Sequence, residues 1–230
     1  MAVELKTASQ EGYSREYYLQ RDNTMFRGEV RHLLTSCHLK TGARVLEVGC
    51  GGGDLLRCCS SIPTVTTVGI DVNVQGMGLA RHLAPQSALA LADAACLPFA
   101  DGLFDAVIAQ HVIEHFDCPD AVLREWQRVL APGGRIAVAT PNAYYPDTEL
   151  FDDPTHCHVY TLPSLVTLFD RNGFRVERAY SLMPYLGSRR LTWRLARLSM
   201  RSLLALRFLP GFSEVGLTLI LQARKEEAAA

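Results

Sequence analysis

The stretch VLEVGCGGGD, residues 45–54, places four glycines within five residues, directly after a short apolar run that contains one acid. An apolar run with β-branched residues predicts a buried strand, and the glycines predict a tight turn into a helix. In an open α/β sheet such a turn lies at the carboxyl edge of the strands, where ligands bind. A dinucleotide fingerprint requires G-x-G-x-x-G, but Asp54 stands where the third glycine would fall. An acid is also unfavourable beside a pyrophosphate, so the stretch favours a ligand of another kind.

Short apolar runs alternate with amphipathic stretches along most of the chain. This alternation predicts a mostly parallel sheet covered on both faces, since parallel strands need crossover connections. The helix after Pro119 has one apolar face and is expected to end at Gly133–Gly134. We therefore predict an α/β fold, a Rossmann-like, doubly wound, seven-stranded sheet whose last strand is antiparallel. The other expected helices are residues 53–62, 74–83 and 162–171, and the strands are 43–48, 65–71, 87–93, 104–110, 135–140, 174–182 and 216–224.

Composition narrows the class of protein. The 230 residues include 23 basic and 24 acidic side chains, so the formal net charge of -1 argues against a general attraction to nucleic acid. No apolar segment approaches the roughly 20 residues that span a bilayer, and the first residues lack the apolar run of a signal peptide. We therefore expect a cytoplasmic protein. Seven irregularly spaced cysteines without a C-x-x-C pair predict neither a disulfide framework nor a zinc ribbon.

Acids close three successive predicted strands. Glu47 lies in the first strand, while Asp71 and Asp93 end the second and the third. A strand-end acid can simply cap a turn, but it can also accept hydrogen bonds from both hydroxyls of a ribose or from an exocyclic amine. Three such acids at one edge of a sheet favour a ligand with an amine, a ribose and an adenine, and no phosphate.

Four ordered blocks resemble the signature of a known family. The blocks run from about residue 45 to residue 142 and read VLEVGCGGG, VGIDVN, LADAACLPFADGLFDAVIAQHVIEHF and RVLAPGGRIAVATPN. They look like the motifs of class I S-adenosylmethionine-dependent methyltransferases, with the closest likeness to the small-molecule group that includes the ubiquinone/menaquinone-biosynthesis type. A looser likeness continues from Asp153 to Leu182. The resemblance implies S-adenosyl-L-methionine as the cofactor and a small-molecule acceptor. We expect the methyl group to be transferred to an oxygen of this acceptor.

The resemblance also implies roles for single residues. Glu47 would orient the methionine amino group, Asp71 would bind the ribose, and Gln110 with His111 would line the methyl-transfer region. The cofactor-binding set that follows is Glu47, Gly49, Cys50, Gly51, Asp71, Val72, Asp93, Ala94 and Gln110. Two alternatives stay open on the same fold: a non-catalytic protein that binds S-adenosylmethionine, and an NAD-dependent oxidoreductase. The missing third glycine counts against the second of these.

Histidines after the fourth and fifth predicted strands are the candidate catalytic groups. A base is needed only if the acceptor is an un-ionised hydroxyl or an acidic carbon. The candidates are His156, His111 and His115, each of which has a structural alternative as a packing residue or pocket wall. In an extended segment only His156 and His158 would converge on a metal, with Asp152 and Asp153 nearby. We expect no metal site.

Two segments lie outside the signature. Residues 1–40 are expected to form an N-terminal helical cap, in which Tyr13, Tyr17, Tyr18 or Arg27 lines the cofactor pocket, or else an amphipathic helix packed on the sheet edge. Residues 41–230 would form the methyltransferase domain, with a basic helical insertion at about residues 184–213. Its arginines would form a solvated face, a cap or dimer element, or a peripheral contact with an anionic membrane or acceptor. The arginines that recur at helical spacing are Arg190, Arg194, Arg197 and Arg201. The oligomeric state is left open.

Overall fold

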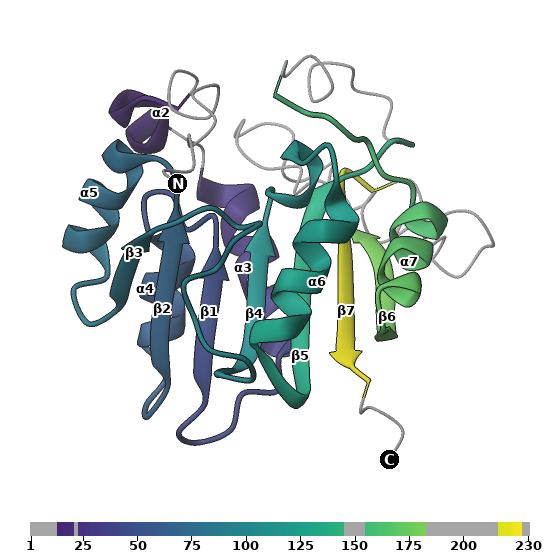
Figure 1. The fold of residues 1–230 in the computed structure, drawn as a ribbon. Coiled ribbons are helices and arrows are strands. Elements are labelled where there is room, and N and C mark those ends of the chain that lie inside the picture. The colour runs from purple at the N-terminus through teal and green to yellow at the C-terminus, as the bar shows by residue number, and fades with distance from the viewer. Residues whose placement is uncertain (1–12, 21–22, 145–154, 183–215, 227–230) are drawn as a thin grey trace, which may run out of the picture.

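The computed structural model describes residues 13–20, 23–144, 155–182 and 216–226, and it contains the predicted seven-stranded sheet (Figure 1). The strand order is β3-β2-β1-β4-β5-β7-β6. β7 runs antiparallel to both of its neighbours, and the other described pairings are parallel. The predicted fold class is thereby confirmed. The strands are β1 (Arg44–Val48), β2 (Thr66–Asp71), β3 (Ala88–Leu91), β4 (Phe104–Gln110), β5 (Leu130–Pro141), β6 (Phe174–Leu182) and β7 (Thr218–Lys225).

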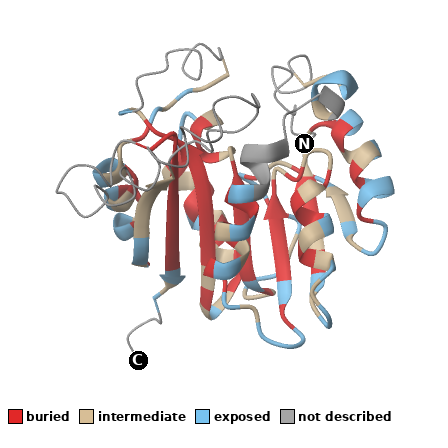
Figure 2. Cartoon of the chain, turned by 180° about the vertical axis from the view of Figure 1, so that it is seen from behind, coloured by how far each residue is buried: buried red, intermediate tan, exposed pale blue. Residues whose placement is uncertain are grey.

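Helices cover both faces of the sheet, as Figure 1 shows. One face packs against α6 and α7, and the other packs against α3 and α4, with α5 beside α4. Successive residues of β1 and β4 are therefore buried on both sides, which explains their continuous apolar sequence and the buried central strands of Figure 2. The helices are α2 (Arg15–Gln20), α3 (Asn23–Ser36), α4 (Asp54–Ser60), α5 (Val74–Leu83), α6 (Pro119–Val129) and α7 (Leu162–Arg171), with a short 3-10 turn, η1 (Ile113–His115).

The end of α6 differs from the prediction. The helix ends at Val129, before the glycines, because Leu130 has the extended backbone angles φ -73 and ψ 135. Leu130 pairs with Phe104 of β4, and the regular pairing resumes at Arg135 after a register shift. Gly133 and Gly134 therefore lie within β5 and do not stop the helix. A strand partner for Leu130 overrides the local signal of the two glycines.

The helical insertion predicted at about residues 184–213 lies outside the described residues, as do its arginines. The division of the chain at residue 40 stays a prediction. In the described part of the chain, no helix has the length and apolar character that a membrane span requires.

Trp126 is the largest fully buried side chain of α6, and its indole Nε1 donates to the carbonyl of Ala94 at 3.0 Å. Trp126→Ala is expected to lower the free energy of unfolding by about 3–5 kcal/mol, because it leaves a cavity in the core. Urea denaturation measures this loss. Arg124→Ala, at an exposed position of the same helix, is the control and should change the stability little. Equal stabilities of the two variants would contradict this description of the core.

Candidate functional site

The glycine turn connects β1 to α4 at the carboxyl edge of the sheet. Gly49, Gly51 and Gly53 all have positive φ angles, of 69, 46 and 88 degrees, which favour glycine. A Cβ atom on Gly51 would lie 2.8 Å from the Tyr18 ring, and one on Gly49 would collide with the side chain of Val112. The predicted tight turn is present, and the side chains of Tyr18 and Val112 approach its backbone closely.

Asp71 ties the end of β2 to the glycine turn. Its Oδ2 accepts a hydrogen bond from the backbone N–H of Gly51 at 2.7 Å, and its Oδ1 accepts one from the N–H of Asn73 at 2.7 Å. Burial raises the pKa of Asp71, and the backbone N–H groups oppose that shift. The carboxylate is thus held beside the turn in a fixed orientation.

The other predicted cofactor residues gather at the same edge. Glu47 is buried in β1, and Ala94 is buried where its carbonyl accepts from Trp126. Asp93 accepts from the N–H of Ala95 at 2.8 Å, which is the turn-capping alternative for this acid. Val72, directly after Asp71, is half-buried. Cys50 is buried, with its sulfur 3.5 Å from that of Met77, and burial raises the pKa of its thiol.

The two described N-terminal helices lie in different places. α2 lies at the carboxyl edge beside α5, where the carbonyl of Tyr13 accepts from Asn73 Nδ2 at 3.0 Å (Figure 1). Tyr18 packs against Gly51 and Gly76, and burial, with the nearby charge of Asp71, raises the pKa of its phenol. α3 instead packs on the face of the sheet through Val30 and Leu33. The side chain of Arg27 lies outside the described residues.

Glu29 of α3 is a site residue that the sequence analysis missed. Its carboxylate is buried, and its Oε2 accepts from Gln110 Nε2 at 2.6 Å and lies 2.9 Å from His111 Nε2. Its Oε1 accepts from the hydroxyl of Thr218 at 2.6 Å. One side chain therefore joins α3 to the ends of β4 and β7. An acid beside Val30, on the apolar face of a predicted helix, is the signal that could have found it.

The charges of this group depend on one another. Burial alone would raise the pKa of Glu29, but the charge of His111 and three side-chain hydrogen bonds lower it to about 2. Burial alone would lower the pKa of His111, but Glu29 and Glu114 raise it to about 10. His111 Nδ1 lies 3.5 Å from Glu114 Oε1, so its imidazole stands between two carboxylates. His111 is consequently a cation near neutral pH, and the structure does not support it as a general base.

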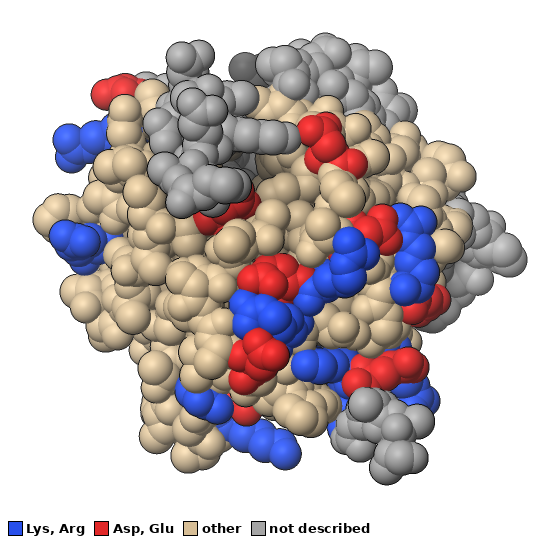
Figure 3. All heavy atoms as spheres, in the orientation of Figure 1, with Lys and Arg blue, Asp and Glu red and all other residues tan. Residues whose placement is uncertain are grey.

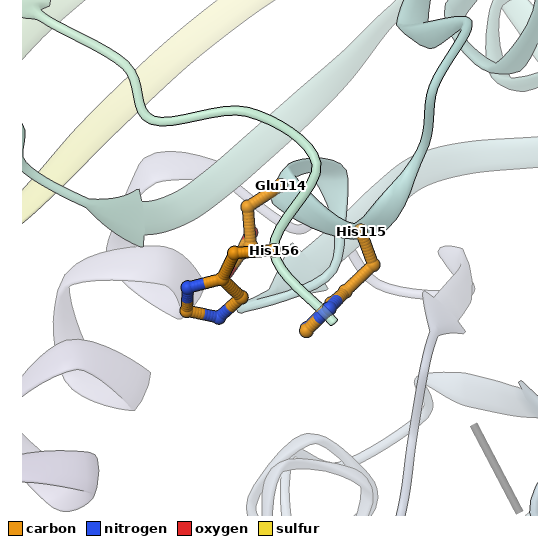
Figure 4. Close-up of side chains that lie close together, drawn as sticks. All are labelled: Glu114, His115 and His156. Carbon is orange, nitrogen blue, oxygen red and sulfur yellow. The ribbon is translucent and has the colours of Figure 1, made fainter. Parts of the chain in front are cut away.

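His115 and His156 meet beside Glu114. Their ring centroids are 4.9 Å apart, and the three side chains lie close together in Figure 4. Two backbone hydrogen bonds bring the segment around His156 to this place, because the N–H groups of Cys157 and His158 both donate to the carbonyl of Glu114, at 2.8 and 3.0 Å. The histidines of two loops thus form one cluster at the carboxyl edge.

His158 lies apart from this cluster. Its Nε2 is 3.2 Å from the carbonyl of Asp117, and its ring lies near Tyr160. The structure therefore does not pair His156 with His158, which was the arrangement considered for a metal, and Asp152 and Asp153 lie outside the described residues.

Charged side chains of both signs alternate on the face that carries α6 (Figure 3). Arg128 lies 2.6 Å from Asp101 and 2.7 Å from Glu125, and Arg171 lies 2.5 Å from Asp120.

A basic hollow of about 520 Å³ lies at the amino edge of the sheet, opposite the candidate site. It is lined by His38, Lys40, Pro132, Gly133, Arg135 and Arg224. This hollow is remote from the candidate site.

Comparisons with known proteins show which proteins this chain is similar to. A family described as "Methyltransferase domain" matches residues 18–179. Methyltransferase GfsG of Streptomyces halstedii is 36% identical over 107 residues, 44% of this chain and 38% of its own. Demethylmenaquinone methyltransferase of Thermus thermophilus is 38% identical over 104 residues, 43% of this chain and 47% of its own. The chain thus spans less than half the length of these two relatives.

A solved structure has the same fold. Phosphoethanolamine N-methyltransferase 2 of Haemonchus contortus, in complex with S-adenosyl-L-methionine, superposes with a TM-score of 0.72 at 15% identity. The match covers 99% of this chain and 61% of that one. At this identity the likeness concerns the fold alone.

Glu29→Gln removes one charge of a buried ion pair and is expected to lower the free energy of unfolding by about 3–5 kcal/mol near neutral pH. The pKa of Glu29 is lower in the folded protein than its ordinary 4.5, so its charge stabilises the fold above that pH, and the contribution is lost as the pH falls toward about 2. The stability difference between wild type and variant should therefore narrow below about pH 4.5. Urea denaturation across this pH range measures it.

Glu16→Gln, at an exposed position of α2, is the control for that experiment. It should leave the stability almost unchanged at each pH. A Glu29→Gln protein as stable as Glu16→Gln near pH 7 would refute the network.

Proposed function

Because this chain belongs to the methyltransferase-domain family, we propose that it transfers a methyl group to a hydroxyl oxygen of a small-molecule acceptor. S-adenosylmethionine is the cofactor of this family of enzymes, and bound there it supplies a methyl group already activated on a sulfonium. One observation carries the proposal: the glycine turn and Asp71 lie near the histidine cluster, at the carboxyl edge of the sheet.

The residues present suit this cofactor. The glycine turn lets a ligand approach the backbone, and Asp71 offers a fixed carboxylate to ribose hydroxyls. Gln110 adds a further group, because its buried Oε1 has no hydrogen-bond partner among the described residues. A buried acceptor of this kind normally meets a ligand or an ordered water. We assign Gln110 Oε1 to an N–H donor of the cofactor.

Tyr18 would close the cofactor site from above the glycine turn. Its ring lies against Gly51 and Gly76, and Tyr13 links it to the histidine cluster, with ring centroids 6.5 Å from Tyr18 and 6.3 Å from His115. We propose that these tyrosines exclude water between the cofactor and the acceptor. Holding two reactants in line supplies much of the acceleration in a displacement reaction, and an aromatic cover favours that alignment.

The acceptor would lie beside His115 and His156. A hydroxyl must lose its proton as its oxygen is methylated, and positioned imidazoles are the usual groups that promote this loss. His111 has a different role from these two histidines. As a cation it contacts Glu29 and Glu114, and it thereby positions the loop after β4. Oxygen is favoured as the methylated atom because these imidazoles gather at one place.

Asp71→Ala is expected to weaken binding of S-adenosylhomocysteine by about 1.5–3 kcal/mol, the range for lost hydrogen bonds to a charged group. Isothermal titration calorimetry measures the loss. Asp105→Ala is the matched control, because Asp105 is an exposed acid of β4 at the opposite edge of the sheet. No binding by folded wild-type protein, or equal affinity in the Asp71→Ala variant, would overturn the cofactor site.

His115→Ala and His156→Ala are each expected to lower kcat by about 10²- to 10⁴-fold, the usual contribution of a positioned acid or base. The affinity for S-adenosylhomocysteine should not change. The assay follows transfer of a labelled methyl group to a panel of phenols, sugars and other hydroxyl compounds. His82→Ala, at an exposed position of α5, is the control. Full activity in both cluster variants would exclude these histidines from the reaction.

A further inference from the structure

We propose that Glu114, His115 and His156 bind one divalent metal ion, which holds and activates the acceptor hydroxyl. The inference rests on the proposed O-methylation and refines it: the two histidines promote loss of the hydroxyl proton by holding the ion, and they do not themselves accept that proton. Each residue offers one ligand atom, and these three atoms all lie within 4.8 Å of one another (Figure 4). Metal–ligand bonds to nitrogen and oxygen are about 2.0–2.2 Å long, so two ligands of one ion lie at most about 4.4 Å apart. Small rotations of these side chains would bring all three atoms to one ion.

One of the two ring nitrogens of His115 already has hydrogen-bond partners. Its Nδ1 lies 3.1 Å from the carbonyl oxygen of Thr155 and 3.1 Å from the hydroxyl of the same residue. A carbonyl can only accept, so Nδ1 carries a proton, and Nε2 is the ring nitrogen that we assign to the ion. A metal-binding histidine typically donates its other N–H to a carbonyl in this way, which fixes the ring orientation.

The two carboxylate oxygens of Glu114 have different neighbours. Its Oε2 accepts a hydrogen bond from the hydroxyl of Thr140 at 3.0 Å. Its Oε1 has no hydrogen-bond partner among the described residues, apart from the ion-pair contact with His111 at 3.5 Å. Glu114 is only 1% exposed, and its ion-pair contact with His111 leaves Oε1 with lone-pair capacity, since each carboxylate oxygen has two lone pairs. Oε1 is therefore the atom we assign to the ion.

The backbone fixes His156 in place relative to the other two ligands. The carbonyl of Glu114 receives the N–H groups of Cys157 and His158, so the residue just before them is held over the η1 turn. Glu114 and His115 are neighbours within that turn. Three ligands from two segments are thus brought together by main-chain hydrogen bonds, before any ion binds.

The ligand set indicates which ions would bind. Two imidazoles and one carboxylate suit Zn²⁺, Fe²⁺, Co²⁺ or Ni²⁺ better than Mg²⁺ or Ca²⁺, which prefer oxygen. Three protein ligands leave at least one position open for an acceptor oxygen, as in catalytic sites. An acceptor with two neighbouring oxygens, such as a catechol or a vicinal diol, would fill two positions and is the class we favour.

The proposed methyl transfer needs no reagent besides the acceptor, the cofactor and the ion. An ion lowers the pKa of a bound hydroxyl, as it does that of bound water, so the hydroxyl proton passes to solvent. The acceptor oxygen then forms the bond to the methyl carbon. The bond between that carbon and sulfur breaks, and its electron pair stays on sulfur, which becomes a neutral thioether.

Titration with Co²⁺ tests the site without an acceptor, because nitrogen-bound Co²⁺ has visible d–d absorption bands. Chelator-treated wild-type protein should bind one ion per chain with those bands. His115→Ala and His156→Ala should each weaken Co²⁺ binding by roughly 100-fold or more, beyond the roughly 10- to 100-fold that even loss of an outer-shell partner costs. His158→Ala is the matched control from the same loop and should bind Co²⁺ like wild type.

Circular dichroism of the same samples shows that each variant is folded, and S-adenosylhomocysteine binding is measured beside Co²⁺ binding. The metal site is refuted, and the proposed function stands, if wild-type protein binds S-adenosylhomocysteine but not Co²⁺. The same holds if the His115→Ala and His156→Ala variants bind Co²⁺ as tightly as wild type. If Co²⁺ binds as expected but S-adenosylhomocysteine does not, the proposed function fails and the ion site remains. Co²⁺ affinity lost in His158→Ala and retained in His156→Ala would also refute the ligand set.

Discussion

Two buried carboxylates, Glu29 and Glu114, face one imidazole at the carboxyl edge of the sheet, and the site depends on this arrangement. A buried carboxylate is costly unless a partner compensates its charge, so each of the two needs the cation of His111. The same contacts join α3, the end of β4, the η1 turn and the start of β7. His111 adopts a φ of 54 degrees, an uncommon backbone conformation for a residue other than glycine. The ion pairs hold it in that conformation.

The cofactor and the acceptor of the proposed reaction would lie beside different strands at the carboxyl edge of the sheet. β1 lies between β2 and β4, so the direction of the strand order reverses beside the glycine turn, where ligands bind in folds of this class. Asp71 and Asp93 follow the strands on one side of that point, and the histidine cluster follows β4 and β5 on the other. A cofactor on the first side and an acceptor on the second would meet near Gln110.

The fold, and the edge of the sheet at which the glycine turn and Asp71 meet, could be predicted because they depend on local signals. Strand β4 coincides with its predicted residues, and the apolar stripe of α6 is buried as expected. The histidine cluster depends on contacts between distant segments, which no local pattern contains. Glu29 is separated from His111 by 82 positions, and whether its acid faces water or His111 is decided only by packing. The two-residue periodicity placed His156 with His158, but it could not indicate that Glu114 binds the backbone of this segment.

The position of β7 has a consequence for biosynthesis. β7 pairs with β5 on one side and with β6 on the other, yet it follows both of them in the sequence. While the chain emerges from the ribosome, β6 has no described strand to pair with, and the outer edge of β5 is exposed until residues 218–225 are made. Exposed strand edges recruit other chains, so this interval is the one in which aggregation competes with folding. The strands that carry the glycine turn, Asp71 and Asp93 can pair before it begins.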